Sequence, residues 1–243
     1  MSASGLSAIR LRRLHDVLAR HVESGGVPGL VALVARRGEV HAEAIGTTAA
    51  GGSEPMRRDT IFRIASMTKP ITAVAAMILV EECKLRLDDP TDDWLPELAN
   101  RKVLRTLDSP LDDTVPAKRP ITLRDLLTFR LGFGAVMAPP GRYPIQQAMA
   151  DAGVAPSPEV PFFPPDELMK RFGGLPLMHQ PGEQWLYHSG SDILGVLIAR
   201  AAGQPLGKFL HERIFAPLGM NDTAFCVPEE KLVRLATAYQ GDR

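Results

Sequence analysis

Residues 62–82 read FRIASMTKPITAVAAMILVEE, and the assignment of the fold starts from this stretch. Ser66 stands three positions before Lys69 at the opening of an apolar segment of helical length. The segment is apolar on nearly every side, which is typical of a helix buried in a protein interior. Pro70 fits such a helix, because donors in a first turn have no intrahelical partner to lose. We therefore predict a buried helix that begins at Ser66.

The spacing of Ser66 and Lys69 has two interpretations. On a helix, residues three apart are neighbours, so Lys69 would lie beside the Ser66 hydroxyl, lower its own pKa by partial desolvation and help remove the serine proton. Alternatively, Ser66 caps the helix and Lys69 points to solvent, since serine is a preferred cap. With ten serines and seven lysines in the chain, about 0.3 occurrences of the S-x-x-K pattern are expected by chance. The spacing alone therefore leaves both interpretations open.

Composition limits the class of protein. A chain of 243 residues that is 45% hydrophobic suits one or two globular domains. The 28 basic residues balance 28 acidic ones, so we expect neither a nucleic-acid nor a membrane partner. No apolar run approaches the roughly 20 residues that span a bilayer, and the N-terminus lacks a signal-peptide core. Cys83 and Cys226 lie far apart, so no structural disulfide is expected and a cytoplasmic location is predicted.

The first third of the chain also predicts a helix and a hairpin. Apolar residues at helical spacing predict a helix over roughly residues 6–24. Residues 30–46 read as two strands around the turn at Arg37-Gly38-Glu39, and no later segment is a convincing third strand. Because an isolated two-stranded hairpin is marginal in water, we expect it to pair with strands from elsewhere, or to be disordered or swapped between molecules.

Shorter helices are predicted further along. The segment ITLRDLLTF, residues 121–129, indicates a helix capped by Thr122 with Asp125 three residues later. Residues 139–182 hold ten of the 21 prolines, which predicts a loop region with short helices. Two amphipathic helices separated by Gly203 should follow.

Several longer stretches resemble one family. The stretches are IFRIASMTKPITAVAAMILVEECKLRLDDPTDDWLPEL, ITLRDLLT, PGEQWLYHSGSDILGVLIARAAGQPLGKFLHERIFAPLGMNDTAF and VPEEKLVRLA. In this order they resemble the β-lactamase and penicillin-binding serine hydrolase superfamily, in its class C-like and esterase branch. The resemblance covers most of the chain after residue 25. It implies an α/β (α+β) fold with an antiparallel sheet flanked by helices, residues 1–60 supplying a helix and hairpin, and residues 61–243 a mostly helical region.

The resemblance also implies roles for matched positions. Ser66 would be the acylated nucleophile, Lys69 its proton acceptor or electrostatic partner, and Tyr187 the general base. A tyrosine suits this role only if a nearby cation lowers its pKa from about 10, and Lys69 is the candidate. Trp185 and Ser189 would contact substrate. Without the family pattern, Tyr187 is an ordinary packing aromatic, and Ser189 is a cap for the helix that follows.

The chain departs from the family pattern in three places. Tyr187-His188-Ser189 replaces the usual Y-x-N, which disfavours β-lactam turnover and favours the esterase and acyltransferase branch. FRLGFG replaces a histidine-containing turn after LLT, and we attach no chemistry to it. The third motif and its oxyanion-hole donor are expected beyond Arg243. We therefore expect a C-terminal segment or a second chain to complete the fold.

The predicted function is serine hydrolysis or acyl transfer on small esters or amides, with no cofactor. The alternatives are a β-lactamase or D,D-peptidase and, in another class, a non-catalytic binding protein on this scaffold. No pair of the six histidines has metal-ligand spacing, so no metal site is expected. The absence of G-x-S-x-G in the sequence disfavours an α/β-hydrolase nucleophile elbow.

Overall fold

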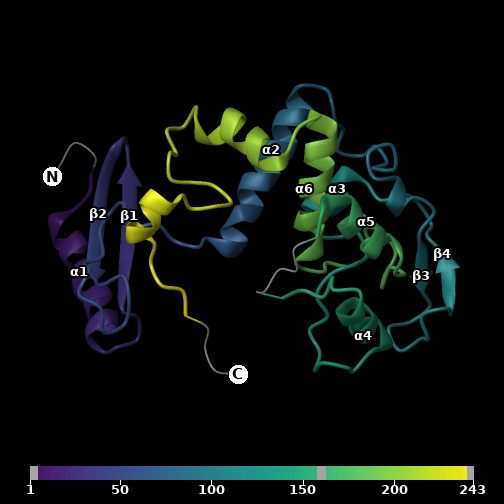
Figure 1. Ribbon diagram of the computed structural model, residues 1–243, viewed down its shortest axis with the longest axis horizontal. Helices are drawn as coiled ribbons and strands as arrows, with labels where there is room; N and C mark the ends of the chain where they lie inside the picture. Colours follow the sequence, from purple (N-terminus) through teal and green to yellow (C-terminus); the bar gives the residue numbers. More distant parts are fainter. Residues whose placement is uncertain (1–4, 158–162, 240–243) are drawn as a thin grey trace. The chain divides into compact units, whose positions relative to one another are not determined.

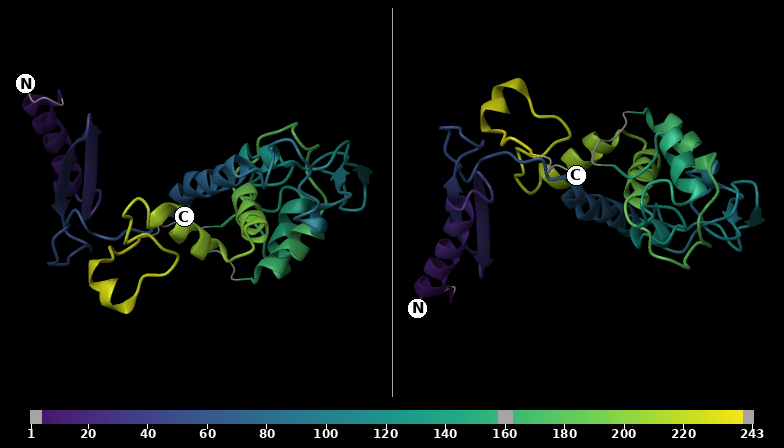
Figure 2. Two further views of the ribbon diagram at one scale, coloured as in Figure 1. Left: turned by 90° about the horizontal axis from the view of Figure 1, so that it is seen from above. Right: turned by 90° about the horizontal axis from the view of Figure 1, so that it is seen from below.

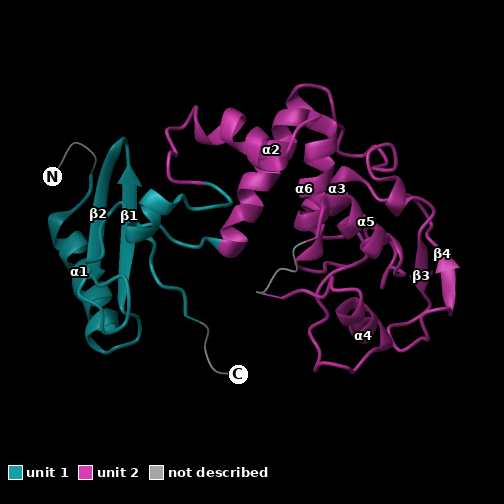
Figure 3. Ribbon diagram, in the orientation of Figure 1, with its two compact units in different colours: residues 1–64, 224–243 teal, residues 65–223 magenta. Residues whose placement is uncertain are grey.

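The chain divides into two compact units, which Figure 3 shows in teal and magenta. The computed structural model describes residues 5–157 and 163–239. Unit 1 comprises residues 1–64 and 224–243, and unit 2 comprises residues 65–223. Unit 1 holds a helix and a β-hairpin, and unit 2 is mostly helical with one short sheet, so the fold class is mixed α/β, as predicted.

In unit 1 a helix lies along a two-stranded antiparallel sheet (Figures 1 and 2). The elements are α1 (Ala8–Glu23), β1 (Gly29–Arg36) and β2 (Glu39–Gly46), followed late in the chain by the 3-10 helix η4 (Glu229–Arg234). Arg37 and Gly38 both have positive φ, 49° and 79°. Two such residues between paired strands form the kind of turn that matches strand twist. The predicted helix and hairpin are therefore confirmed.

The two faces of the hairpin differ. Towards α1, the Glu43 carboxylate contacts His15 Nδ1 at 2.9 Å and His41 Nε2 at 2.7 Å, and these contacts lower its pKa, His15 contributing most. The opposite face carries Leu33 and Val40, whose side chains are 57% and 47% exposed. The two strands pair with each other along their full length, and no third strand joins them among the described residues.

The end of the chain returns to unit 1, whereas we predicted that everything after residue 60 belongs to the helical region. The Ile61 amide donates to Arg234 O at 2.8 Å, and the Ala236 amide donates to Ile61 O at 2.9 Å. The Thr237 amide donates to Thr48 O at 3.0 Å. These hydrogen bonds join segments that lie far apart in the chain, so no local sequence pattern predicts them.

Unit 2 is built around one hydrophobic core. Its helices α2 and α6 pack against each other, and α3, α5 and α7 contact α6 (Figure 1). The elements are η1 (Ala65–Met67), α2 (Thr68–Glu81), η2 (Pro96–Leu98), β3 (Lys102–Leu104), β4 (Thr114–Pro116), α3 (Leu123–Leu127), α4 (Pro144–Asp151), α5 (Pro165–Gly173), α6 (Ser189–Ala202), α7 (Leu206–Leu210) and the π-helical turn η3 (His211–Phe215).

Helix α2 corrects two details of the prediction. It begins at Thr68, and Ser66 lies in the preceding 3-10 turn. Its buried residues are Thr72, Ala75, Ala76 and Leu79, whereas Val74 and Met77 are 51% and 44% exposed. An all-apolar sequence fits a helix buried on every side, but here only the side that faces the core of unit 2 is covered.

The short sheet β3–β4 was not predicted. Each strand has three residues, paired in the register Lys102↔Pro116 to Leu104↔Thr114. The segment at Leu177 extends it: the Leu104 amide donates to Leu177 O, and the Leu177 amide donates to Lys102 O, both at 2.8 Å. Three residues are too few for a two-residue alternation to be recognised.

Other predicted signals are confirmed. Thr122 and Asp125 form a reciprocal capping box at the start of α3. Gly203 follows α6 with a φ of 65°, the left-handed conformation that ends many helices. Helices α4 and α5 lie within the proline-rich region, of which residues 158–162 fall outside the described residues. No single helix in the described ranges is long and apolar enough to cross a bilayer, and α6 with Leu206–Phe215 reaches that composition only as a pair bent by 79°.

An ion-pair network ties α6 to two neighbouring elements. The Arg200 guanidinium donates to both carboxylate oxygens of Glu97 at 2.9 and 2.7 Å and to Asp166 Oδ1 at 2.8 Å. It also donates to Trp94 O at 2.9 Å. Side chains of Arg200 and Glu97 are mostly buried, while that of Asp166 is 79% exposed.

We predict that Arg200→Met lowers the free energy of unfolding by about 2 kcal/mol, because the mostly buried Glu97 loses a bidentate, charge-assisted partner. Asp166→Asn is the matched control and should change stability by less than about 0.5 kcal/mol, because an exposed ion pair contributes little. Urea unfolding of both variants measures the difference. Equal effects would show that the Arg200–Glu97 pair does not anchor α6.

Candidate active site

Ser66 and Lys69 are brought together at the start of α2. Ser66 is exposed, and Lys69 Nζ donates to its Oγ at 3.1 Å. Ser66 does not cap α2, whose N-cap position is Met67 without a side-chain cap bond. The interpretation of Ser66 as a helix cap with a solvated lysine is therefore wrong. Ala65 has a φ of 42°, so the backbone enters the site through a conformation that is uncommon for a non-glycine residue.

Tyr187 approaches the same two side chains from the segment that precedes α6. Lys69 Nζ lies over the tyrosine ring, 4.7 Å from its centroid. A hydrogen bond with the Ser66 hydroxyl, and then the bond and charge of Lys69, lower the pKa of the Tyr187 phenol below its ordinary value of 10. Among the described residues Lys69 forms no ion pair with a carboxylate, so its charge acts mainly on these two hydroxyl groups.

An aromatic group surrounds Tyr187. The Trp185 ring stacks on it at a centroid distance of 5.7 Å and an angle of 23°, and the Phe129 ring lies 5.6 Å from it. Phe129 was missed, although it is the first residue of FRLGFG, where the chain departs from the family pattern. Phe129 has a φ of 57°, and its carbonyl accepts a hydrogen bond from the Leu186 amide at 2.8 Å. This backbone geometry places its ring beside those of Trp185 and Tyr187.

The chain segments on either side of Tyr187 are packed closely. The Ala135 amide donates to Tyr187 O at 2.8 Å. A Cβ atom on Gly134 would lie 2.6 Å from the carbonyl oxygens of Leu186 and Tyr187, so only glycine fits there. This backbone contact holds the tyrosine segment against the turn that follows α3.

The two predicted substrate contacts are placed differently. Trp185 is 55% exposed and presents an indole face next to Tyr187, so it can contact a bound molecule. Ser189 is 1% exposed at the start of α6, and its Oγ is buried without a hydrogen-bond partner among the described residues. It does not cap α6, because it is the first helical residue. A contact between Ser189 and substrate would require another side-chain orientation.

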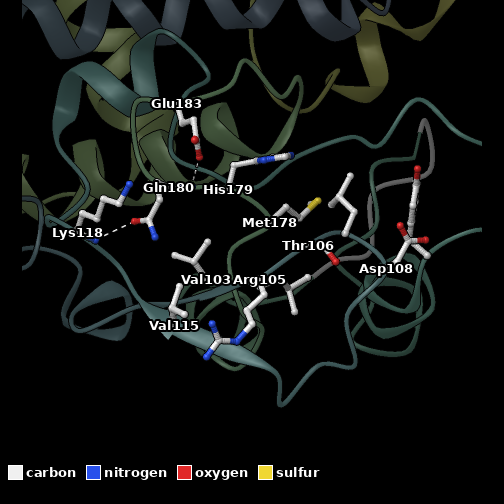
Figure 4. Close-up of a pocket in the computed structure, with 13 residues that line it drawn as sticks. Val103, Arg105, Thr106, Asp108, Val115, Lys118, Met178, His179, Gln180 and Glu183 are labelled. Atoms are coloured by element: carbon white, nitrogen blue, oxygen red, sulfur yellow. Dashed lines mark hydrogen bonds between the residues drawn. The ribbon is translucent and has the colours of Figure 1, made fainter.

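Unit 2 also has a recess of about 660 Å³ next to β3 and β4 (Figure 4). Val103, Val115 and Met178 form apolar lining, and Arg105, Lys118 and Glu183 contribute charge. Much of the charge is already engaged: Arg105 Nε donates to Asp113 Oδ1 at 2.8 Å, and Glu183 Oε2 accepts from the Gln180 amide at 3.1 Å. None of Ser66, Lys69 and Tyr187 lines it, so the recess is separate from the site.

Comparison with known proteins identifies the class of protein. The sequence model of the family described as Beta-lactamase matches residues 14–243, so the chain belongs to this family. Protein Rv1367c of Mycobacterium tuberculosis is 40% identical over 222 residues, which are 90% of this chain and 53% of the relative. Esterase EstB of Burkholderia gladioli is 34% identical over 240 residues, 98% of this chain and 56% of the relative.

The solved structures agree with this assignment. EstCE1, described as a hydrolase with promiscuous acyltransferase activity, superposes with a TM-score of 0.81 and 29% sequence identity. The alignment covers 96% of this chain and 57% of that one. The chain thus spans about half the length of the relatives that it matches.

The geometry of the site predicts how Tyr187 titrates. Ser66→Ala and Lys69→Met should each raise the pKa of the phenol towards 10, because each removes a group that favours the phenolate. Alkaline difference spectra, with Tyr187→Phe as the reference, report this titration directly. Lys84→Met is a charge-matched control, since Lys84 follows the far end of α2 and contacts Glu82 at 3.1 Å. An unchanged titration in Lys69→Met would show that the ammonium does not act on Tyr187.

Proposed function

We propose that this protein hydrolyses or transfers acyl groups of small esters or amides through an acyl-enzyme at Ser66. The observation that carries the proposal is the 3.1 Å contact between Lys69 Nζ and Ser66 Oγ, with Tyr187 beside both. A nucleophile next to a group that takes its proton is the arrangement required for covalent acyl transfer. The membership of the beta-lactamase family supports the same chemistry.

In the proposed reaction, Ser66 Oγ forms a bond to the acyl carbon while Tyr187, as phenolate, accepts the hydroxyl proton. The bond to the leaving oxygen or nitrogen then breaks, and Tyr187 returns the proton to that leaving group. Water completes hydrolysis of the acyl-enzyme, and an alcohol in its place completes transfer. Lys69 remains an ammonium and stabilises the phenolate, which is the role that its position over the ring supports.

An esterase is favoured over a β-lactamase or D,D-peptidase. The second motif has Ser189 where the broad family has asparagine, and this serine is buried with no bonding partner among the described residues. The site therefore lacks the asparagine side-chain amide that the broad family has at this position. The names of EstB and EstCE1, an esterase and a hydrolase with acyltransferase activity, support the same choice.

The other class, a non-catalytic binding protein, is disfavoured by the contacts of the site. A scaffold kept only for binding would not need a lysine directed at a serine hydroxyl and a tyrosine of lowered pKa. The exposed face of Trp185 would accommodate an apolar part of the substrate.

We further propose that a C-terminal segment or a second chain completes the fold. The motivation is the apolar hairpin face with Leu33 and Val40, together with the length of the relatives, of which this chain matches about half. Such a segment or chain would supply strands for the hairpin edge and an oxyanion-hole donor, which is typically worth about a hundred- to a thousand-fold in rate. The cytoplasmic location remains a prediction.

A fluorophosphonate probe tests the nucleophile. We expect one covalent adduct, localised to Ser66 by peptide mapping, because this hydroxyl is exposed and contacts Lys69. Ser66→Ala should abolish labelling, whereas Ser191→Ala, a serine in α6, should label like the wild type. Labelling that persists in Ser66→Ala would overturn the assignment.

Substrate preference tests the class of hydrolase. We expect a higher kcat/KM for short-chain aryl esters than for a chromogenic cephalosporin, since Ser189 presents no amide to a β-lactam. Ester turnover should rise as pH passes the lowered pKa of Tyr187, because the phenolate is the base, and Tyr187→Phe should depress kcat strongly. A clear preference for the cephalosporin would restore the β-lactamase interpretation.

A further inference from the structure

His188 has the most unusual backbone near the site. It lies directly between Tyr187 and the first residue of α6, with φ of 91° and ψ of −79°. These angles correspond to a γ-turn with positive φ, a rare and strained conformation for a residue with a side chain. Such strain persists only where the surrounding structure holds it, and it concentrates at functional sites.

The residues on both sides of His188 are held in place by contacts with the rest of unit 2, so the change in chain direction falls at His188 itself. On one side, the Ala135 amide binds Tyr187 O at 2.8 Å. On the other side, Ser189 is buried, and Gly190 is pressed so close to Leu126 O that a Cβ atom would lie 2.9 Å from it. The chain therefore has to change direction at His188.

The imidazole of His188 is held by contacts on two sides. Its ring meets the Tyr187 ring edge-on, with centroids 6.2 Å apart and an angle of 87°. Its Nδ1 lies 3.4 Å from Asp192 Oδ2, one turn further along α6. The side chain that carries the strained backbone thus contacts both the tyrosine and the helix.

We propose that His188 is a positioning residue, whose strained turn, held by Asp192 and the Tyr187 ring, directs the phenol towards Ser66 and Lys69. The proposal rests on the proposed function, because it assigns a purpose to the direction of Tyr187. It makes no demand on substrate identity. A residue that only connects two elements would affect stability, whereas a positioning residue affects the phenol itself.

Two substitutions separate these roles. His188→Val introduces a β-branched side chain, which disfavours positive φ, and should shift the turn. We expect kcat to fall about 10- to 100-fold with KM within about threefold, as for a displaced catalytic group. His188→Asn tolerates positive φ and keeps a polar group near Asp192, so kcat should stay within about threefold of the wild type.

The titration of Tyr187 provides a readout that needs no turnover. In His188→Val, the phenol should titrate at higher pH than in the wild type, because it has moved away from Ser66 and Lys69. In His188→Asn the wild-type titration should be retained. If the protein proves inactive on every ester, this measurement still decides the proposal, so its failure is distinguishable from failure of the proposed function.

Cys83→Val is the matched control for backbone strain. Cys83 also has positive φ, 57°, and follows α2 at roughly 20 Å along the helix from Lys69. The Cys83→Val substitution should lower the melting temperature yet leave kcat and the Tyr187 titration unchanged. If His188→Val behaves like this control, with only stability affected, the proposal is overturned. A shifted phenol titration in His188→Val alone supports it.

Discussion

The packing of α2 against α6 is the constraint on which the site depends. Ser66 lies in the turn just before α2, Lys69 lies in the first turn of α2, and Tyr187 lies just before α6. Ala75 and Ala76 on α2 are fully buried, and the apolar residues of α6 that belong to the same core are buried as well. Small side chains at a helix contact allow a short interaxial distance. The contact between a lysine and a distant tyrosine is thus a consequence of how two helices pack.

A second layer of structure supports the tyrosine. Gly134 allows the turn after α3 to lie directly against the segment before α6, and Gly132, with a φ of 90°, allows the same turn to lie against the carbonyl of His179. Backbone hydrogen bonds from Leu186 to Phe129 and from Ala135 to Tyr187 close this contact. Side chains on both glycines would collide with carbonyl oxygens. The site therefore depends on backbone contacts as much as on the side chains that would perform chemistry.

Charge is used differently in the scaffold and in the site. In the scaffold, guanidinium groups meet carboxylates in bidentate pairs, as Arg119 does with Asp125 and Arg200 with Glu97. These pairs hold elements together and neutralise one another. Lys69 instead faces the Ser66 hydroxyl and the Tyr187 ring, and among the described residues it forms no ion pair with a carboxylate. A positive charge at this position can stabilise an anion that forms during the reaction.

The sequence by itself determined the features that arise between residues close in the chain. The capping box of Thr122, the hairpin turn at Arg37 and the left-handed end of α6 at Gly203 follow from local geometry. The spacing of Ser66 and Lys69 allowed their contact but left the cap interpretation open. The family resemblance added Tyr187. Tertiary structure alone decided the pairing of Ile61 with residues 234–236, the three-residue strands, the burial of Ser189 and the contacts of Phe129, because these depend on packing between distant segments. The strain at His188 has the same origin: it exists only because both neighbouring segments are fixed by the rest of unit 2, and no local pattern encodes that.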